Sequence, residues 1–470
     1  MSSNNTSGDI DSSSSPPILQ NEVKYDLYRG HPNDQALPTS EIQSIMSSLL
    51  HDDHRESLMC SLGYGSNAGN EGLLLALRSF LDRRTSNDDT GEVVNEKDGS
   101  EFFITNGVSH GIELLCSTCT RPGDEVWIER PTYFLAPKIF TSHGLVIKPL
   151  PMISDRPSVE GQEKKDAIGR IDLERLIRMV ECEGVPPPKM IYVIPSYHNP
   201  TGRSMTVEER TKLATFAIRN NVLLVADEVY HLLDWDQNQL KIEREALSGF
   251  RDSDATSSSS LRPASMTHFN NIRSASDFMG QPTLGCCISV SSFTKIFAPG
   301  VRLGWIQAPP YIIQRLTNYG YINSQGGVAP FMGRLMTQAI ETGLLDQYLN
   351  KLNLDYSERY GLICNILEKE PRIEILTKHS PVKRKGGYFL WVQFPDEVDS
   401  EEFASYSLKE YGVRFMPGGR SDPFPLHDNP SRLLINSCAR LCFADLDREK
   451  LVVATTTFVK AFQTFLQLKA

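Results

Sequence analysis

Long apolar runs are absent from this sequence. No stretch of about 18 consecutive apolar residues occurs in the 470-residue chain, so no membrane-spanning helix is expected. A basic excess is absent too, because the formal net charge is −10 at pH 7. That balance argues against a nucleic-acid partner, which needs a basic face. The acidic residues are spread along the chain and favour solubility instead.

Cysteine is scarce and irregularly placed. The nine cysteines include the pairs Cys116/Cys119 and Cys286/Cys287, and neither pair has a second half at the spacing of a zinc site. Cys116 falls in an apolar helical pattern, so we expect it to be buried. No metal site is predicted, and the pattern is typical of a reducing compartment.

The first twenty residues lack targeting signals. They are rich in serine, and they have neither the basic and apolar regions of a secretory signal nor the arginines of a mitochondrial presequence. We therefore expect a disordered tail over 1–20 and a cytoplasmic protein.

What the chain does contain is a regular alternation of short strands and helices. The strand candidates are continuous apolar runs bounded by Gly, Pro, Asn or Asp, a pattern that predicts a mostly parallel sheet with helices on both faces. These runs are EFFIT (101–105), EVWIER (125–130), LVIKPL (145–150), MIYVIP (190–195), VLLVAD (222–227), CCISVSS (286–292) and LGWIQA (303–308).

The last third of the chain has a different character. Helical patterns over 330–352 and 356–368 precede short strands such as GGYFLWVQF, which predicts a smaller α+β domain. Between the two parts, a serine-rich and charged stretch over 242–282 predicts a surface insertion.

The segment SSFTKIFAPGVRLGW, residues 291–305, carries the most informative chemistry. Lys295 follows the end of an apolar strand, where parallel sheets bind ligands. A desolvated lysine can lose its proton and form an imine with an aldehyde. Ser292 and Arg302 could hold a phosphate. A lone lysine in a loop is usually a surface residue, so this interpretation depends on its companions.

Other strand ends carry polar residues that match. Asp227 ends VLLVAD, and its burial would be costly without a positive partner such as a protonated ring nitrogen. A helix N-cap is an equally good explanation for Asp227 alone. Tyr230 follows three residues later, and Asn199 stands in the turn of PSYHNPTG. Both could bind a ring oxygen.

Two further groups complete the set. Gly107 turns a strand into a helix, so that the amides of Val108 and Ser109 form an anion site at the helix N-terminus. Tyr133 follows another strand and could stack on a flat ring. Each of these features also has an ordinary explanation. Asn199 fits a plain turn, Gly107 a plain strand–helix connection and Tyr133 a tyrosine of the core. One planar, phosphorylated aldehyde with a pyridinium nitrogen and a phenolic oxygen would satisfy all of them together.

With these motifs the chain resembles the class I/II aminotransferases, which are pyridoxal-5′-phosphate (PLP) enzymes of fold type I. LGYGSNAGNEGLLLALRSFL and YRGHPNDQALP are similar to segments of the 2-aminoadipate/kynurenine aminotransferase-like branch, with Leu37 where Phe is usual. The resemblance runs from about Tyr25 to the last residues. It implies an α/β fold with a seven-stranded, mostly parallel sheet sandwiched by helices. The division implied is an N-terminal segment (21–60) joining the small domain, a large PLP-binding domain (61–325) and a small C-terminal domain (326–470).

The resemblance also implies residue roles. Lys295 would form the Schiff base with PLP and shuttle the proton of the substrate. Arg432 in SRLLINS would bind the substrate α-carboxylate, with Arg440 as the alternative. Tyr64 would reach the active site of a neighbouring subunit, which implies a homodimer with shared sites. The other contacts would be Asp227 to the ring nitrogen; Asn199 and Tyr230 to the ring oxygen; Tyr133 on the ring; Gly107, Val108, Ser109, Ser292 and Arg302 at the phosphate; and Gly30, Asn199 and Tyr64 near the substrate.

Val108 departs from the branch, which usually has serine there, so only its backbone amide can serve the phosphate. The predicted reaction is a ping-pong transamination between an aromatic, 2-aminoadipate or branched-chain L-amino acid and a 2-oxo acid such as 2-oxoglutarate. A PLP-dependent lyase of the 1-aminocyclopropane-1-carboxylate synthase type would use the same lysine and aspartate and stays open. A non-enzymatic PLP-binding regulator is disfavoured, because only about twenty polar residues precede the match.

Overall fold

The computed structural model describes residues 23–51, 55–85, 100–154, 169–235, 265–271, 285–382, 385–424 and 432–469. The tail expected over 1–20 lies outside these residues, as does most of the insertion expected over 242–282.

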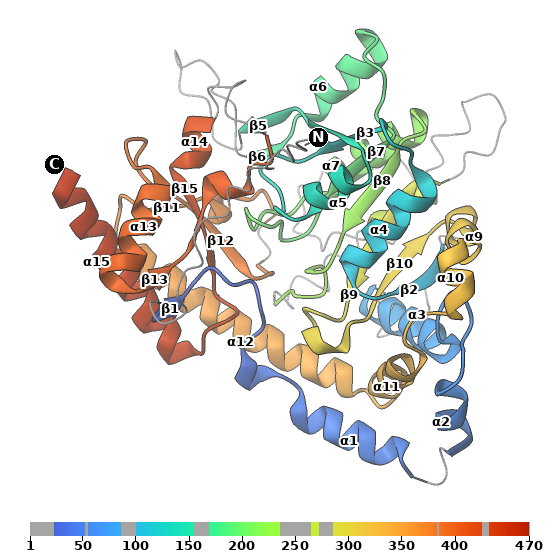
Figure 1. The fold of residues 1–470 in the computed structure, drawn as a ribbon. Helices are drawn as coiled ribbons and strands as arrows, with labels where there is room; N and C mark the ends of the chain where they lie inside the picture. The colour runs from blue at the N-terminus through green and yellow to red at the C-terminus, as the bar shows by residue number, and fades with distance from the viewer. Residues whose placement is uncertain are drawn as a thin grey trace, which may run out of the picture.

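A seven-stranded sheet forms the centre of the molecule (Figure 1). Its strand order is β2-β10-β9-β8-β7-β3-β4, and every pair is parallel except those of β10, which runs antiparallel to β2 and to β9. The seven apolar runs predicted from the sequence form these seven strands, and the prediction of an α/β fold is confirmed. The strands are β2 (Glu101–Thr105), β3 (Glu125–Ile128), β4 (Val146–Pro149), β7 (Met190–Val193), β8 (Leu223–Asp227), β9 (Cys287–Ser292) and β10 (Gly304–Ala308).

Helices cover both faces of this sheet. Successive strand residues point to opposite sides, so these apolar strands present apolar side chains on both faces. In β2, Phe103 packs toward one face, while Phe102 and Ile104 pack toward the other. One face is covered by α4 (Val108–Cys119), α5 (Ala136–Ser142) and α9 (Pro310–Thr317). The other is covered by α3 (Glu71–Thr85), α6 (Leu173–Ile177), α7 (Val207–Arg219) and α11 (Pro330–Glu341).

A second, antiparallel sheet organises the C-terminal part. Its order is β11-β12-β15-β14, with β11 (Glu374–Ile375), β12 (Phe389–Gln393), β14 (Met416–Pro417) and β15 (Cys438–Cys442). It is accompanied by α13 (Ser400–Tyr411), α14 (Arg432–Asn436) and α15 (Arg448–Lys469).

The N-terminal segment joins this C-terminal part. Strand β1 (Tyr25–Asp26) pairs in parallel with β13 (Val413–Arg414), and Figure 1 shows the blue β1 among the red elements. Leu27, the next residue, is fully buried in the core. The pairing carries the following residues, Tyr28 to His31, to the edge of the large domain. Further elements are α1 (Thr39–Leu49), α2 (Arg55–Ser61), α10 (Gly320–Gln325) and the antiparallel pair β5 (Met152–Ser154) and β6 (Gly169–Ile171).

Three expectations need correction. The helix expected over 330–352 ends at Glu341, and α12 (Leu344–Leu367) begins after Gly343, whose φ of +73° breaks the helix in the left-handed region that glycine tolerates. The break expected between 352 and 356 is wrong, because α12 continues through these residues. The surface insertion expected over 242–282 is wrong for Met266–Asn271, a short 3-10 helix in which Met266 is fully buried. Its anchor is Glu228, which accepts hydrogen bonds from the Ser265 hydroxyl (2.6 Å) and the Met266 amide (3.2 Å).

Two apolar features have structural roles. Among the described residues, α15 is the one helix long and apolar enough to cross a membrane by length and composition. Its buried side chains pack against α12 and α13, so it is a core helix of the C-terminal part. Cys116 is buried in α4 as expected, and Cys119 is buried there too; burial raises the pKa of Cys116 to about 12.

Candidate active site

Two of the residues predicted to bind the cofactor lie where β8 and β9 end. Asp227 is the last residue of β8 and pairs with Val290 of the neighbouring β9, and Lys295 follows β9 by three residues. Ligands bind at the carboxyl ends of parallel strands, because the strand-to-helix loops leave a crevice there. The fold therefore brings the aspartate and the lysine to one edge of the sheet.

Asp227 is a buried carboxylate with one free oxygen. Its Oδ2 accepts a 2.8 Å hydrogen bond from the Tyr192 hydroxyl, while Oδ1 is buried without a hydrogen-bond partner. Burial raises the pKa of Asp227 to about 6, and hydrogen bonds from the Tyr192 hydroxyl and the Val229 backbone amide oppose that rise. An unpartnered buried carboxylate oxygen is costly, so the site fits a positively charged donor such as a protonated pyridine nitrogen.

Lys295 is a half-buried amine beside the N-terminal segment. Its Nζ donates a 2.5 Å hydrogen bond to the carbonyl of Gly30 and lies 5.3 Å from the centroid of the Tyr388 ring. Burial lowers the pKa of Lys295 to about 8, and the Arg440 guanidinium acts in the same direction. A lysine with this pKa is neutral in a substantial fraction near pH 8, which suits a nucleophile or a base.

The residues predicted to bind the phosphate lie on both sides of strand β10. Gly304 pairs with Thr105 of β2 on one side and with Ser292 of β9 on the other, so both strand ends converge. Gly304 has no room for a side chain, since a Cβ there would lie 2.5 Å from the Ser291 carbonyl oxygen. This register places Ser292 near the start of α4.

Arg302 lies against that helix start. Its Nη2 donates to the carbonyl of Asn106 at 3.4 Å and would lie 3.0 Å from a Cβ on Gly107, whose φ is +82°. Helix α4 then begins at Val108, with Ser109 exposed. A guanidinium beside the first amides of a helix is a suitable anion site. Ser292 is buried, and its hydroxyl contacts the Leu303 carbonyl (3.0 Å).

Arg440 is a buried cation next to these groups. Its Nη1 donates to Asn199 Oδ1 at 2.9 Å and its Nη2 to the Tyr28 carbonyl at 2.6 Å, and the guanidinium lies 4.1 Å from the centroid of the Phe389 ring. In the part of the chain that the structure describes, Arg440 forms no ion pair with a carboxylate, and its buried Nε has no hydrogen-bond partner. A buried, uncompensated guanidinium calls for an anion.

Arg432, the first choice for this role from the sequence, begins α14, and its side chain lies outside the described residues. Its role stays a prediction, but Arg440 is the arginine beside Asn199. The sequence contains a signal for Arg440, since Arg440-Leu441-Cys442-Phe443 matches the R-L-x-F pattern of the aminotransferases that the chain resembles, and SRLLINS does not.

Three tyrosines complete the set. Tyr230 is buried with its ring centroid 5.5 Å from that of Tyr388. Tyr133 is half-buried; burial raises its pKa to about 12, and Asp227 and Arg440 also influence it, which places it among these groups. Tyr64 is 90% exposed and packs beside Gly326, so its role in a neighbouring subunit stays a prediction.

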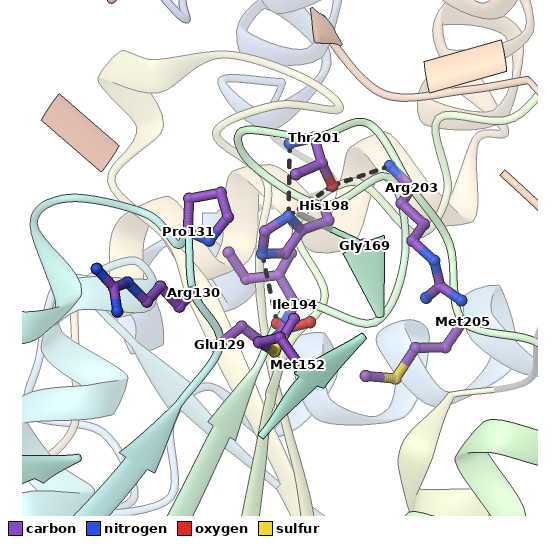
Figure 2. A pocket seen from close by; sticks show the side chains of 10 residues that line it. All are labelled: Glu129, Arg130, Pro131, Met152, Gly169, Ile194, His198, Thr201, Arg203 and Met205. Atoms are coloured by element: carbon purple, nitrogen blue, oxygen red, sulfur yellow. Dashed lines mark hydrogen bonds and ion pairs between the residues drawn. The ribbon is translucent and has the colours of Figure 1, made fainter. Parts of the chain in front are cut away.

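A small cavity lies behind the turn that carries Asn199 (Figure 2). In it, His198 Nε2 faces Glu129 Oε2 at 3.4 Å, and His198 Nδ1 bonds the Thr201 hydroxyl at 2.9 Å. Burial raises the pKa of Glu129 to about 8 and lowers that of His198 to about 3, so both are neutral near pH 7. Lys295, Asp227 and Arg440 do not line this cavity. The contacts of His198 with Glu129 and Thr201 instead stabilise the turn that carries Asn199.

A mostly parallel seven-stranded sheet whose strand ends carry this lysine, aspartate and helix start is the architecture of a fold type I aminotransferase. The chain belongs to the family Aminotransferase class I and II, whose model matches residues 54–458. Members of this family bind PLP.

Individual relatives are distant. The aromatic-amino-acid aminotransferase 1 of Thermococcus litoralis is 23% identical over 428 residues, which cover 90% of this chain and 84% of the relative. The 2-aminoadipate transaminase of Thermus thermophilus is 23% identical over 371 residues, 78% and 77% of the two chains. The structure of Pyrococcus horikoshii kynurenine aminotransferase in complex with PMP has a TM-score of 0.71 at 20% identity and covers 95% and 92%. The resemblance to the class I/II aminotransferases is confirmed, and kynurenine and 2-aminoadipate aminotransferases are among the structural neighbours.

Proposed function

We propose that this protein is a PLP-dependent aminotransferase that moves an amino group from an L-amino acid to a 2-oxo acid such as 2-oxoglutarate by a ping-pong mechanism. The observation that carries the proposal is the free, buried Oδ1 of Asp227 at the strand ends where Lys295 also lies. An aspartate in this state and an amine of lowered pKa are the two groups that PLP needs from a protein.

When bound, PLP supplies an aldehyde that bonds to amines and a ring that takes up the negative charge left by a departing Cα proton. Asp227 would hold the ring nitrogen in its charged form through Oδ1. Asn199 would bind the ring oxygen through its Nδ2 atom, because its Oδ1 already accepts a hydrogen bond from Arg440, and Tyr230 would be the second partner of that oxygen. The remaining groups are the phosphate contacts Gly107, Val108, Ser109, Ser292 and Arg302, and Tyr133 on the ring.

Lys295 and Arg440 act on the substrate. The Nζ of Lys295 accepts the Cα proton, and its lowered pKa keeps part of the amine neutral at physiological pH. Arg440 binds the α-carboxylate, which supplies the anion missing from its surroundings. Fixing the carboxylate orients the Cα–H bond toward Lys295, and positioning of this kind is worth several kcal/mol.

A homodimer with shared sites is part of the proposal. Four apolar side chains between residues 50 and 64 are 64–90% exposed, and Leu75 is 71% exposed. Exposed apolar residues clustered along one part of a chain are typical of an interface. Tyr64 belongs to this set, as expected of a residue that reaches a neighbouring active site. The four residues are Leu50, Met59, Leu62 and Tyr64.

Half-reaction spectroscopy tests the proposal. PLP-loaded protein is mixed with one L-amino acid at a time, and the loss of the bound cofactor's absorbance is followed, with aromatic, 2-aminoadipate and branched-chain donors compared. We expect conversion with at least one donor and glutamate formation after 2-oxoglutarate is added. Ammonia release without glutamate would indicate a lyase instead.

Lys295→Ala is the matched control. The variant should fold, retain little covalently bound PLP and lose turnover. Borohydride reduction followed by peptide mapping should place a pyridoxyl group on Lys295 in the unaltered protein. Folded protein without that adduct would overturn the proposal.

A further inference from the structure

We propose that Tyr192 is a positioning residue that holds Asp227 in its ionised form and directs its free oxygen toward the cofactor. The inference rests on the proposed function and adds a group to it, since Tyr192 was predicted only as part of an apolar strand.

The sheet register brings the two side chains together. Tyr192 of β7 pairs with Val225 of β8, and Asp227 lies two residues further along β8. Residues two apart in a strand point to the same face, so Tyr192 and Asp227 share one side of the sheet. Their contact is the 2.8 Å hydrogen bond from the Tyr192 hydroxyl to Asp227 Oδ2.

Tyr192 cannot easily move away from Asp227. Its side chain is fully buried, and its ring meets Phe140 edge-on at 5.4 Å between centroids. Close packing holds such a ring in one rotamer. The hydroxyl is therefore a fixed donor beneath the carboxylate.

That hydroxyl is the side-chain donor to Asp227, and the backbone amide of Val229 acts in the same direction on its pKa. A hydrogen bond to a carboxylate favours the ionised form and is stronger than one between neutral groups. With Oδ2 occupied, the remaining Oδ1 is the oxygen that can meet a ring nitrogen. Without the hydroxyl, both oxygens would lack a side-chain donor, and the proton of the ring nitrogen would shift toward Asp227.

Tyr192→Phe isolates this effect, because it removes one oxygen atom. The dissociation constant of PLP is measured against pH, and the ¹⁵N chemical shift of ring-labelled PLP reports the protonation of its nitrogen. We expect about a tenfold weaker affinity near pH 8, equivalent to about 1.4 kcal/mol. We also expect the acid limb of the profile to move to higher pH and the ¹⁵N shift to move toward unprotonated pyridine.

The control is Tyr348→Phe. Tyr348 is also buried and donates a 2.8 Å hydrogen bond, but to the backbone carbonyl of Ala36. Its loss should leave the pH profile and the ¹⁵N shift unchanged even if thermal stability falls. Both variants leave in place the other titratable groups around Asp227, which are Glu228, Lys295, Tyr133 and Tyr230.

The outcomes separate the two proposals. A Tyr192→Phe protein with the original profile and ¹⁵N shift overturns the role of Tyr192, whereas unaltered protein that binds no PLP overturns the proposed function. If Tyr192→Phe does not fold, 3-fluorotyrosine at position 192 keeps the ring and makes the hydroxyl a stronger donor. The acid limb should then move to lower pH, and an unmoved limb contradicts the inference.

Discussion

Arg440 and Asp227 share one condition at the scale of single residues. Each is buried with a polar atom left without a partner, Nε in the arginine and Oδ1 in the aspartate. Such atoms are costly in the protein alone and are retained where a ligand supplies the missing contact. The two residues carry opposite charges, which suits a ligand pair with one cationic ring nitrogen and one carboxylate.

Replacing Arg440 by lysine should weaken substrate binding selectively. Lysine keeps the charge but cannot reach both Asn199 and the Tyr28 carbonyl with a planar fork. We expect KM for the amino acid to rise about 100-fold, equivalent to about 3 kcal/mol, with PLP affinity retained. Steady-state kinetics check this, and Arg432→Lys is the matched control. A larger effect at Arg432 would return the carboxylate role to that residue.

Replacing Asp227 by asparagine should stabilise the PLP-free protein at high pH only. The pKa of Asp227 is about 6 in the folded chain and about 3.9 in an unfolded one, so the folded state binds the proton more tightly. Ionisation therefore costs stability as pH rises above about 4, and the cost is complete above about 6.

The size of this cost is about 3 kcal/mol at most, from about 1.36 kcal/mol per pKa unit. Urea unfolding of both PLP-free proteins at pH 5 and pH 8 measures it. The asparagine variant should gain stability relative to the original protein between the two pH values and should bind PLP poorly. An equal difference at both pH values would contradict the assignment of the raised pKa.

At the scale of elements, the seven strands of the large sheet were predictable because each is a continuous apolar run closed by a turn residue. The helix break at Gly343 could not be predicted from the sequence, because the apolar pattern of α11 continues without interruption into α12. The sequence alone could not decide whether Arg432 or Arg440 binds the carboxylate. That decision depends on the pairing of β15 with β12, which places Arg440 opposite Trp391. Tyr192 has no sequence signal of its own, since a tyrosine inside a strand reads as core.

Replacing Gly30 by alanine tests how the N-terminal segment meets β12. A Cβ on Gly30 would lie 2.8 Å from Cζ of Phe389, the ring that supports Arg440. The ring must shift, and we expect kcat/KM to fall about tenfold, since small displacements of positioning groups are costly. Gly361→Ala is the control, because a Cβ there meets nothing within 4 Å in the middle of α12. It should leave kinetics unchanged and add up to about 1 kcal/mol of helix stability.

At the scale of the whole molecule, the exposed apolar residues from Leu50 to Leu75 predict assembly. A charged residue buried in an apolar interface is strongly unfavourable, so Leu62→Glu combined with Leu75→Glu should yield monomers. Activity should fall with dimer content, because Tyr64 would no longer reach a second chain. Analytical ultracentrifugation and kinetics at several protein concentrations check this.

Leu354→Glu is the control for assembly, as Leu354 is 64% exposed on α12. It should leave the sedimentation unchanged. A double variant that stays dimeric, or unaltered protein that is an active monomer, would contradict the shared site.

The carbonyls of Tyr28 and Gly30 are held by Arg440 from the C-terminal part and by Lys295 from the large domain. A few residues near the beginning of the chain thus lie directly against the candidate active site. Limited proteolysis that cuts between Asp26 and His31 should therefore abolish turnover while both sheets remain folded. Protein that lacks residues 1–27 should be less stable as well as inactive, because it loses the pairing of β1 with β13 and the fully buried Leu27.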